Sequence, residues 1–254
     1  MDINFLAILA IMAFLVGLGK TGLPGISIIG IPVFILLYDA RIALGLILII
    51  FLFADCIAVI VYRKYFDLKN LALMIIPAGI GVYVATLLGD VIDDNTFKII
   101  IALFLFISAI LMSFKNKILH LFDSSLESST TRFNASSSGI GFLAGFVSMI
   151  SNAAAPVTII YFVLMKTDKY VMIGISAWFY FFINIIKLGF HITLWESVNL
   201  ETIMRVSLVL PFLFLGAFIG VKLLKIIPKK IFDKVLLIIV YLSAFVLFFV
   251  TLIA

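Results

Sequence analysis

Six continuous apolar runs of about 20 residues constrain the fold of this sequence more than any other feature. A run of this length spans the hydrocarbon core of a bilayer as one helix. The chain is 65% hydrophobic and 12% charged, whereas a soluble domain is nearer half apolar and a quarter charged. We therefore predict an all-α polytopic protein of the cytoplasmic membrane. The runs are Ile42–Tyr62, Leu71–Gly89, Phe97–Phe114, Val171–His191, Ile203–Val221 and Val235–Ile253.

Four shorter apolar arms form two predicted helical hairpins, one at the start of each half of the chain. A helix of about 14 residues reaches only about 21 Å, against a hydrocarbon core of about 30 Å. We favour re-entrant hairpins whose tips meet near the middle of the membrane. The alternative, in which each arm is a short full span, stays open. The arms cover approximately residues 5–18, 26–38, 139–150 and 157–165.

The two halves of the sequence also align with each other. Phe14–Gly17 matches Phe142–Gly145, Pro77 falls on Pro211, and Asp55 falls on Asn184. A hairpin followed by three spans changes sides, so the second half is inverted relative to the first, as in many secondary transporters. We assign residues 1–114 and 139–254 to the two membrane repeats and 115–138 to a Ser-rich cytoplasmic linker.

Basic residues in the loops predict the orientation. Strict alternation of the spans puts 13 of the 18 basic residues on one side and only Arg41, Lys98 and Arg205 on the other. By the positive-inside rule the first side is cytoplasmic, and both termini then lie outside.

The two hairpin tips carry the candidate binding residues. Irregular backbone at membrane depth survives only where it is buried in protein or lines a cavity, and paired interruptions in two halves point to a substrate site. Ionisable groups inside the membrane are functional candidates because their burial is costly. The predicted substrate-binding residues are Lys20, Thr21, Gly22 and Gly25 in the first tip, Ser148, Ser151 and Asn152 in the second, and Asn184 and Lys187 on the following span.

Lys20 lies among glycines that let backbone N–H groups approach a ligand. If the second arm begins near Leu23, its N-terminus and Lys20 together form an anion site. In the second tip, Asn152 is expected to cap the arm that begins at Ala153, either as a purely structural cap or as a ligand group as well. With two lysines against one aspartate, these residues favour a small oxyanion over a cation.

Asp55 is the acidic residue inside the apolar spans, and two roles are open for it. It is the candidate carrier of a coupled proton. The alternative is a structural ion pair with Lys20 or Lys187, and a carboxylate whose partner alternates would combine the two roles.

At these residues the chain resembles the sulfite exporter TauE/SafE family, also called the 4-toluene sulfonate uptake permease family. Lys20-Thr21-Gly22 with Gly25 and Pro32 is similar to the first-half signature, and Asn184 with Lys187 is similar to an Asn-x-x-Lys pattern. Ser151–Pro156 resembles a Ser-Asn-Ala-Ala-Gly-Pro pattern, with Ala155 where Gly is usual. The resemblance implies transport of sulfite, other sulfur oxyanions or organosulfonates.

We therefore predict a secondary transporter for a small anion, with a passive anion channel as the alternative. No nucleotide-binding motif is present, so ion gradients or the membrane potential must supply the energy. Paired carboxylates and catalytic motifs are lacking, which argues against an enzyme. The single cysteine, Cys56, supports no disulfide framework or cysteine metal site, and we expect no cofactor and no nucleic-acid partner. A homo-oligomer is compatible with the sequence.

Overall fold

A computed structural model describes residues 3–23, 26–66, 68–113, 130–164 and 169–228, with five single residues beyond them. This part of the chain is helical, with α1 (Ile3–Thr21), α2 (Gly30–Leu37), α3 (Ala40–Tyr62), α4 (Leu68–Val91) and α5 (Asp94–Ser113) in the first half. The second half contributes α7 (Thr130–Ser151), α8 (Ala155–Leu164), α9 (Lys169–Thr193), α10 (Leu200–Ser207) and α11 (Leu210–Ile226). Short 3-10 turns cover Ile26–Ile29 and Arg63–Tyr65.

Four described helices are long and apolar enough to cross a membrane, and a fifth span is present if α10 and α11 count as one bent pair. The prediction of a polytopic all-α protein is confirmed. The predicted runs over Ile42–Tyr62, Leu71–Gly89, Phe97–Phe114 and Val171–His191 correspond to α3, α4, α5 and α9. The last run, Val235–Ile253, lies outside the described residues apart from isolated positions.

The prediction of one continuous helix over Ile203–Val221 is wrong. The chain forms α10 and α11 instead, bent by 57° at a two-residue break. Pro211 lies in the first turn of α11, where its missing N–H costs nothing, whereas inside one continuous helix its ring would clash with the carbonyl of Ser207.

The two arms of each hairpin also differ in length, which the sequence analysis did not anticipate. α1 has 19 residues and is itself a candidate span, and α7 begins at Thr130, inside the range assigned to the linker. The second arms are short, with eight residues in α2 and ten in the described part of α8. Arm length therefore does not favour re-entry for α1, while α2 is too short to span alone.

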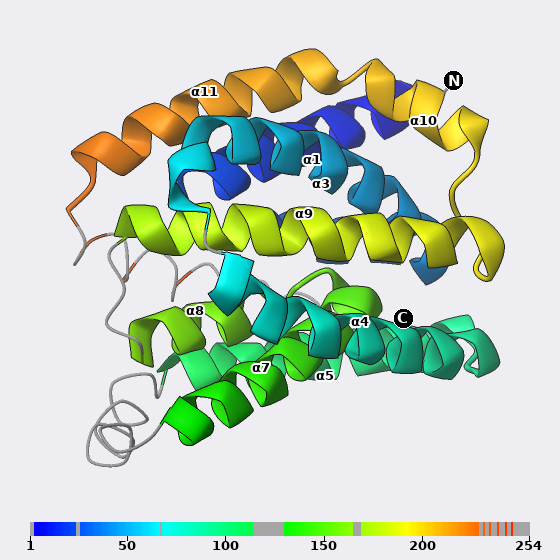
Figure 1. The fold of residues 1–254 in the computed structure, drawn as a ribbon. Coiled ribbons are helices and arrows are strands. Elements are labelled where there is room, and N and C mark those ends of the chain that lie inside the picture. Colours follow the sequence, from blue (N-terminus) through cyan, green and yellow to red (C-terminus); the bar gives the residue numbers. More distant parts are fainter. Residues whose placement is uncertain are drawn as a thin grey trace.

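Figure 1 shows two groups of helices on either side of α9. In the upper group α1 packs along α11, and in the lower group α7 packs along α4, while α3 and α4 both contact α9. The first arm of each half thus packs against a helix of the other half.

Glycines permit this close packing. A Cβ at Gly17 of α1 would lie 2.2 Å from the carbonyl oxygen of Leu213, and one at Gly145 of α7 would lie 2.0 Å from that of Ala78. Small residues that let two helix backbones approach are a common basis of helix association in membranes. The matched positions Gly17 and Gly145 therefore both allow the first arm of a hairpin to pack closely against a helix of the other half.

Candidate functional site

The two hairpin tips line one cavity between α3 and α9. Gly19 and Lys20 contribute from the end of α1, and Ser148 and Asn152 contribute from the end of α7 and the turn after it. Phe51 of α3 and Tyr180 of α9 also line it, together with apolar side chains and the hydroxyl-bearing Ser27, Thr158 and Ser176. The cavity volume is about 50 Å³, which is room for a few waters or one small anion.

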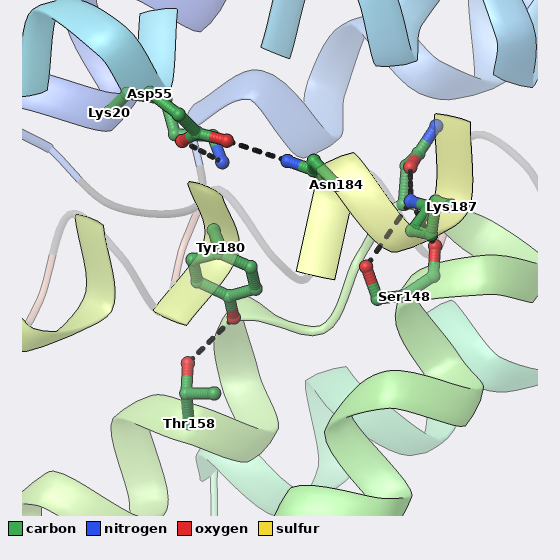
Figure 2. Close-up of polar contacts among 8 residues, drawn as sticks. Lys20, Asp55, Ser148, Thr158, Tyr180, Asn184 and Lys187 are labelled. Carbon is green, nitrogen blue, oxygen red and sulfur yellow. Dashed lines mark hydrogen bonds and ion pairs between the residues drawn. The ribbon is translucent and has the colours of Figure 1, made fainter. Parts of the chain in front are cut away.

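Lys20 forms an ion pair inside this site. Its Nζ lies 2.7 Å from Oδ1 of Asp55, and Nδ2 of Asn184 donates to the other carboxylate oxygen over 2.6 Å (Figure 2). Asp55 is fully buried, whereas the Lys20 side chain is 12% exposed and borders the cavity. This geometry is the ion pair that the sequence analysis gave as one of two roles for Asp55.

Two aromatic rings flank the same ammonium group. Lys20 Nζ lies 4.5 Å from the ring centres of both Phe51 and Tyr180, within the range of a cation–π interaction. The Tyr180 hydroxyl is in turn hydrogen-bonded to Thr158 of α8 over 2.8 Å. Phe51 was not among the predicted site residues, although its spacing of four residues before Asp55 places both on one face of α3.

Lys187 is fully buried and has neutral partners. Its Nζ donates to the Ser148 carbonyl oxygen over 2.8 Å, to Ser148 Oγ over 3.2 Å and to Asn152 Oδ1 (Figure 2). An ammonium at Nζ can donate to all three acceptors, and no carboxylate lies within ion-pair distance of Nζ in the described part of the chain.

Asn152 does not cap α8 as the sequence analysis expected. Its backbone is left-handed, with φ of 54°, and its side chain donates to the Leu44 carbonyl oxygen over 3.2 Å while accepting from Lys187. Asparagine tolerates this conformation better than most residues. Asn152 thus links α3 to α9 at the cavity wall, and α8 begins later, at Ala155.

Thr21 and Gly22, which follow Lys20, contact protein and do not line the cavity. Lys20 itself lies in the last turn of α1, next to a helix C-terminus and not the N-terminus that we expected. Thr21 Oγ1 donates to the carbonyl oxygens of Gly17 and Ala217, at 2.9 and 2.8 Å. Gly22 packs against Gly220, where a Cβ would lie 2.1 Å from a carbonyl oxygen. Gly25 lies outside the described residues.

The remaining predicted residues are buried beside the cavity. Ser151 Oγ donates to the Val147 carbonyl and accepts from the Ala153 N–H, so its role is to shape the second tip. Asn184 Oδ1 has no hydrogen-bond partner among the described residues. No group of His, Cys, Asp and Glu side chains in the described part of the chain could hold a metal ion.

Comparison with known proteins decides the family. The sequence model of the sulfite exporter TauE/SafE family matches residues 9–247. The chain belongs to the TauE/SafE family. Neither the curated proteins nor the solved structures contain a match.

Family membership confirms several predictions from the sequence. TauE/SafE proteins are integral membrane transporters of sulfite and related sulfur anions, and they are not enzymes. In this TauE/SafE protein Lys20 borders the cavity, and Lys187 contacts Ser148 and Asn152 in the cavity wall.

Proposed function

We propose that this TauE/SafE protein is a secondary transporter that moves a small sulfur oxyanion or organosulfonate by alternating access at the cavity between the hairpin tips. One observation carries the proposal: the amino group of Lys187 is fully buried, and its described partners are all neutral. Removing an unpaired charge from water costs several kcal/mol. An anion in the adjacent cavity would compensate this charge.

The cavity wall supplies donors for that anion. Ser148 Oγ accepts a hydrogen bond from Lys187, which leaves its own O–H proton to donate. Asn152 uses one of its two amide protons on Leu44, and the second is available. Because both groups contact the ammonium directly, their dipoles are oriented to favour a negative charge in the cavity.

Lys20 is the second cation of the site, and its ion pair with Asp55 can change when an anion enters the cavity. It borders the cavity and is held by Asp55 and two aromatic rings. An entering anion can share this ammonium with Asp55, so the substrate would lie between Lys20 of the first hairpin and Lys187 of α9. With both lysines protonated, two positive charges against one negative give the described site a net charge of +1.

The packing of the helices supports an inverted repeat. In the sequence repeat α1 corresponds to α7 and α4 to α11, so the α1–α11 contact corresponds to the α7–α4 contact. Since α3 corresponds to α9, the α3–α9 contact joins two equivalent helices. A pair of repeats arranged around one site is a frequent basis of alternating access.

The driving force follows from the charge of the substrate. When the cell interior is negative, the export of one negative charge is favoured by about 2.3 kcal/mol per 100 mV of membrane potential. Export can proceed on the membrane potential alone, whereas uptake requires coupling to a cation.

Flux measurements on proteoliposomes test this proposal. We expect saturable uptake of labelled sulfite and methanesulfonate, faster when the same anion is loaded inside, because a carrier returns more quickly with substrate bound. Lys187→Met should abolish this exchange, while Lys222→Met, which removes an exposed lysine of α11, should not. Flux without saturation or exchange would indicate a passive channel, and no anion flux would contradict the proposal.

A further inference from the structure

A second buried polar cluster lies one helical turn beyond Lys187 on α9. His191 is fully buried, and its Nδ1 lies 2.6 Å from Ser197 Oγ. Its Nε2 is also buried and has no hydrogen-bond partner in the described part of the chain. A buried, unsatisfied ring nitrogen is uncommon and calls for an explanation.

The loop after α9 holds this imidazole in place. The loop folds back into the bundle, so that Ser197 is buried and both Ser197 and Val198 donate backbone hydrogen bonds to the His191 carbonyl oxygen. Trp195 packs edge-on against the imidazole at 4.9 Å and donates to the Thr86 carbonyl oxygen. The ring is therefore fixed on one side, and its free nitrogen is not the product of a loose side chain.

Lys187 is the charged group that acts on this ring. Lys187 and His191 are four residues apart, on one face of α9, and Lys187 is the charged residue with an electrostatic effect on the imidazole. Among the other titratable groups nearby, Glu196 on the loop and Asp90 on α4 are exposed. Arg41 on α3 is engaged by the carbonyl oxygens of Gly89 and Ile92.

We propose that His191 is the proton-binding residue that couples proton movement to anion movement in this transporter. The proton binds at Nε2, the ring nitrogen without a partner. A proton there makes the imidazole a second cation next to Lys187, and two buried cations repel each other. An anion at Ser148 and Asn152 offsets that repulsion, so anion and proton each favour binding of the other, and they do so reciprocally.

The same geometry assigns a different role to Asp55. Asp55 Oδ1 is ion-paired with Lys20 and Oδ2 accepts a hydrogen bond from Asn184, whereas His191 Nε2 has neither kind of partner in the described part of the chain. This inference rests on the proposed anion transport, since without a bound anion there is nothing for the proton to accompany.

Proteoliposome uptake of labelled methanesulfonate, which does not titrate near neutral pH, tests the proposal. With one proton per anion, a pH difference of one unit should change the wild-type accumulation ratio about tenfold. His191→Gln should still exchange methanesulfonate at equal pH on both sides and lose the accumulation. The matched control is His120→Gln, which replaces the other histidine of the chain and should behave like the wild type.

Two further measurements keep the test decisive if His191→Gln does not fold. Ser197→Ala retains the imidazole and removes its partner, so accumulation should persist with a displaced pH midpoint. Calorimetry on the wild-type protein in buffers of different ionisation enthalpy should show uptake of about one proton per methanesulfonate bound.

The outcomes separate the two proposals. Exchange without any effect of pH in the wild type, or full pH-driven accumulation by His191→Gln, would overturn the assignment of His191 and leave anion transport standing. No wild-type flux of methanesulfonate or sulfite would contradict the proposed function itself.

Discussion

Asp55 and Asn184 occupy matched positions in the two halves of the sequence, and they contact each other, with Asn184 Nδ2 donating to Asp55 Oδ2 over 2.6 Å. If the two halves form the proposed inverted repeat, residues at matched positions touch only where both lie close to its two-fold axis. In an inverted repeat this axis runs in the membrane plane, at the depth where such transporters bind substrate. The contact therefore supports a midplane location for the cavity beside it.

The Lys20–Asp55 pair predicts a specific pattern of stabilities. Breaking a buried ion pair leaves one uncompensated charge and costs about 3–5 kcal/mol, whereas removing both charges is often close to neutral. We expect Lys20→Met and Asp55→Asn each to lower the thermal unfolding temperature in detergent, and the double variant to recover most of the loss. Additive effects of the two substitutions would show that the residues do not act as a pair.

The glycine contacts predict opposite effects at two positions. Gly145→Ala should destabilise the protein, by about 1–3 kcal/mol or more, because its Cβ would meet the backbone of α4. Gly189→Ala on α9 is the matched control, since in the described part of the chain no atom beyond its own helix backbone and chain neighbours lies within 4 Å of its Cβ position. There alanine should be neutral or stabilising by up to about 1 kcal/mol. Thermal shift measurements on the two variants compare them directly, and equal effects would contradict the close α7–α4 packing.

The sequence allowed prediction of the parts of the fold that depend on hydropathy and spacing. Long apolar runs located α3, α4, α5 and α9, because burial in a bilayer leaves little choice for such segments. Element ends were less predictable: α1 continues through Lys20 to Thr21. Its glycines suggested an interruption, but Gly17, like Gly22 just after the helix, packs against the α11 backbone, a tertiary contact that local sequence does not reveal.

The candidate site was predictable by residue type but not by partner. The cost of burying charge pointed to Lys20, Asp55 and Lys187, and all three are indeed buried or nearly so. Which groups they contact depends on the register of α9 against both hairpin tips. The left-handed backbone of Asn152, which turns its side chain toward Lys187, has no signal in a single sequence.

The predicted orientation can be checked by cysteine labelling from either side of the membrane, in a background where the exposed Cys56 is replaced by serine. A cysteine at Phe66 should react only from the cytoplasmic side, and one at Glu196 only from outside, because the basic loops are predicted to face inward. Glu196 is preferable to its neighbour Val198, which is buried. Labelling of position 66 from outside would reverse the orientation.

Replacement of Lys20 tests the cavity as the anion site. Lys20→Ala removes the cation that borders the cavity, so we expect sulfite and methanesulfonate exchange to fall at least 100-fold while the protein still inserts and remains monodisperse. Lys98→Ala, which removes a lysine paired with Asp94 one turn away, is the control and should retain exchange. Wild-type flux by Lys20→Ala would place the site elsewhere.

Asp55→Asn separates a structural ion pair from a proton carrier. Asparagine retains the shape of the side chain and can still contact Asn184, but it cannot exchange a proton. If Asp55 carries the proton, as the sequence alone allowed, the variant should exchange methanesulfonate yet lose accumulation driven by a pH difference.

The structure favours the other result, because Lys20 and Asn184 occupy both carboxylate oxygens. We therefore expect Asp55→Asn to be less stable than the wild type, to exchange anion more slowly because Lys20 is no longer held, and to retain its response to pH. Loss of that response in Asp55→Asn, with His191→Gln unaffected, would assign the coupled proton to Asp55.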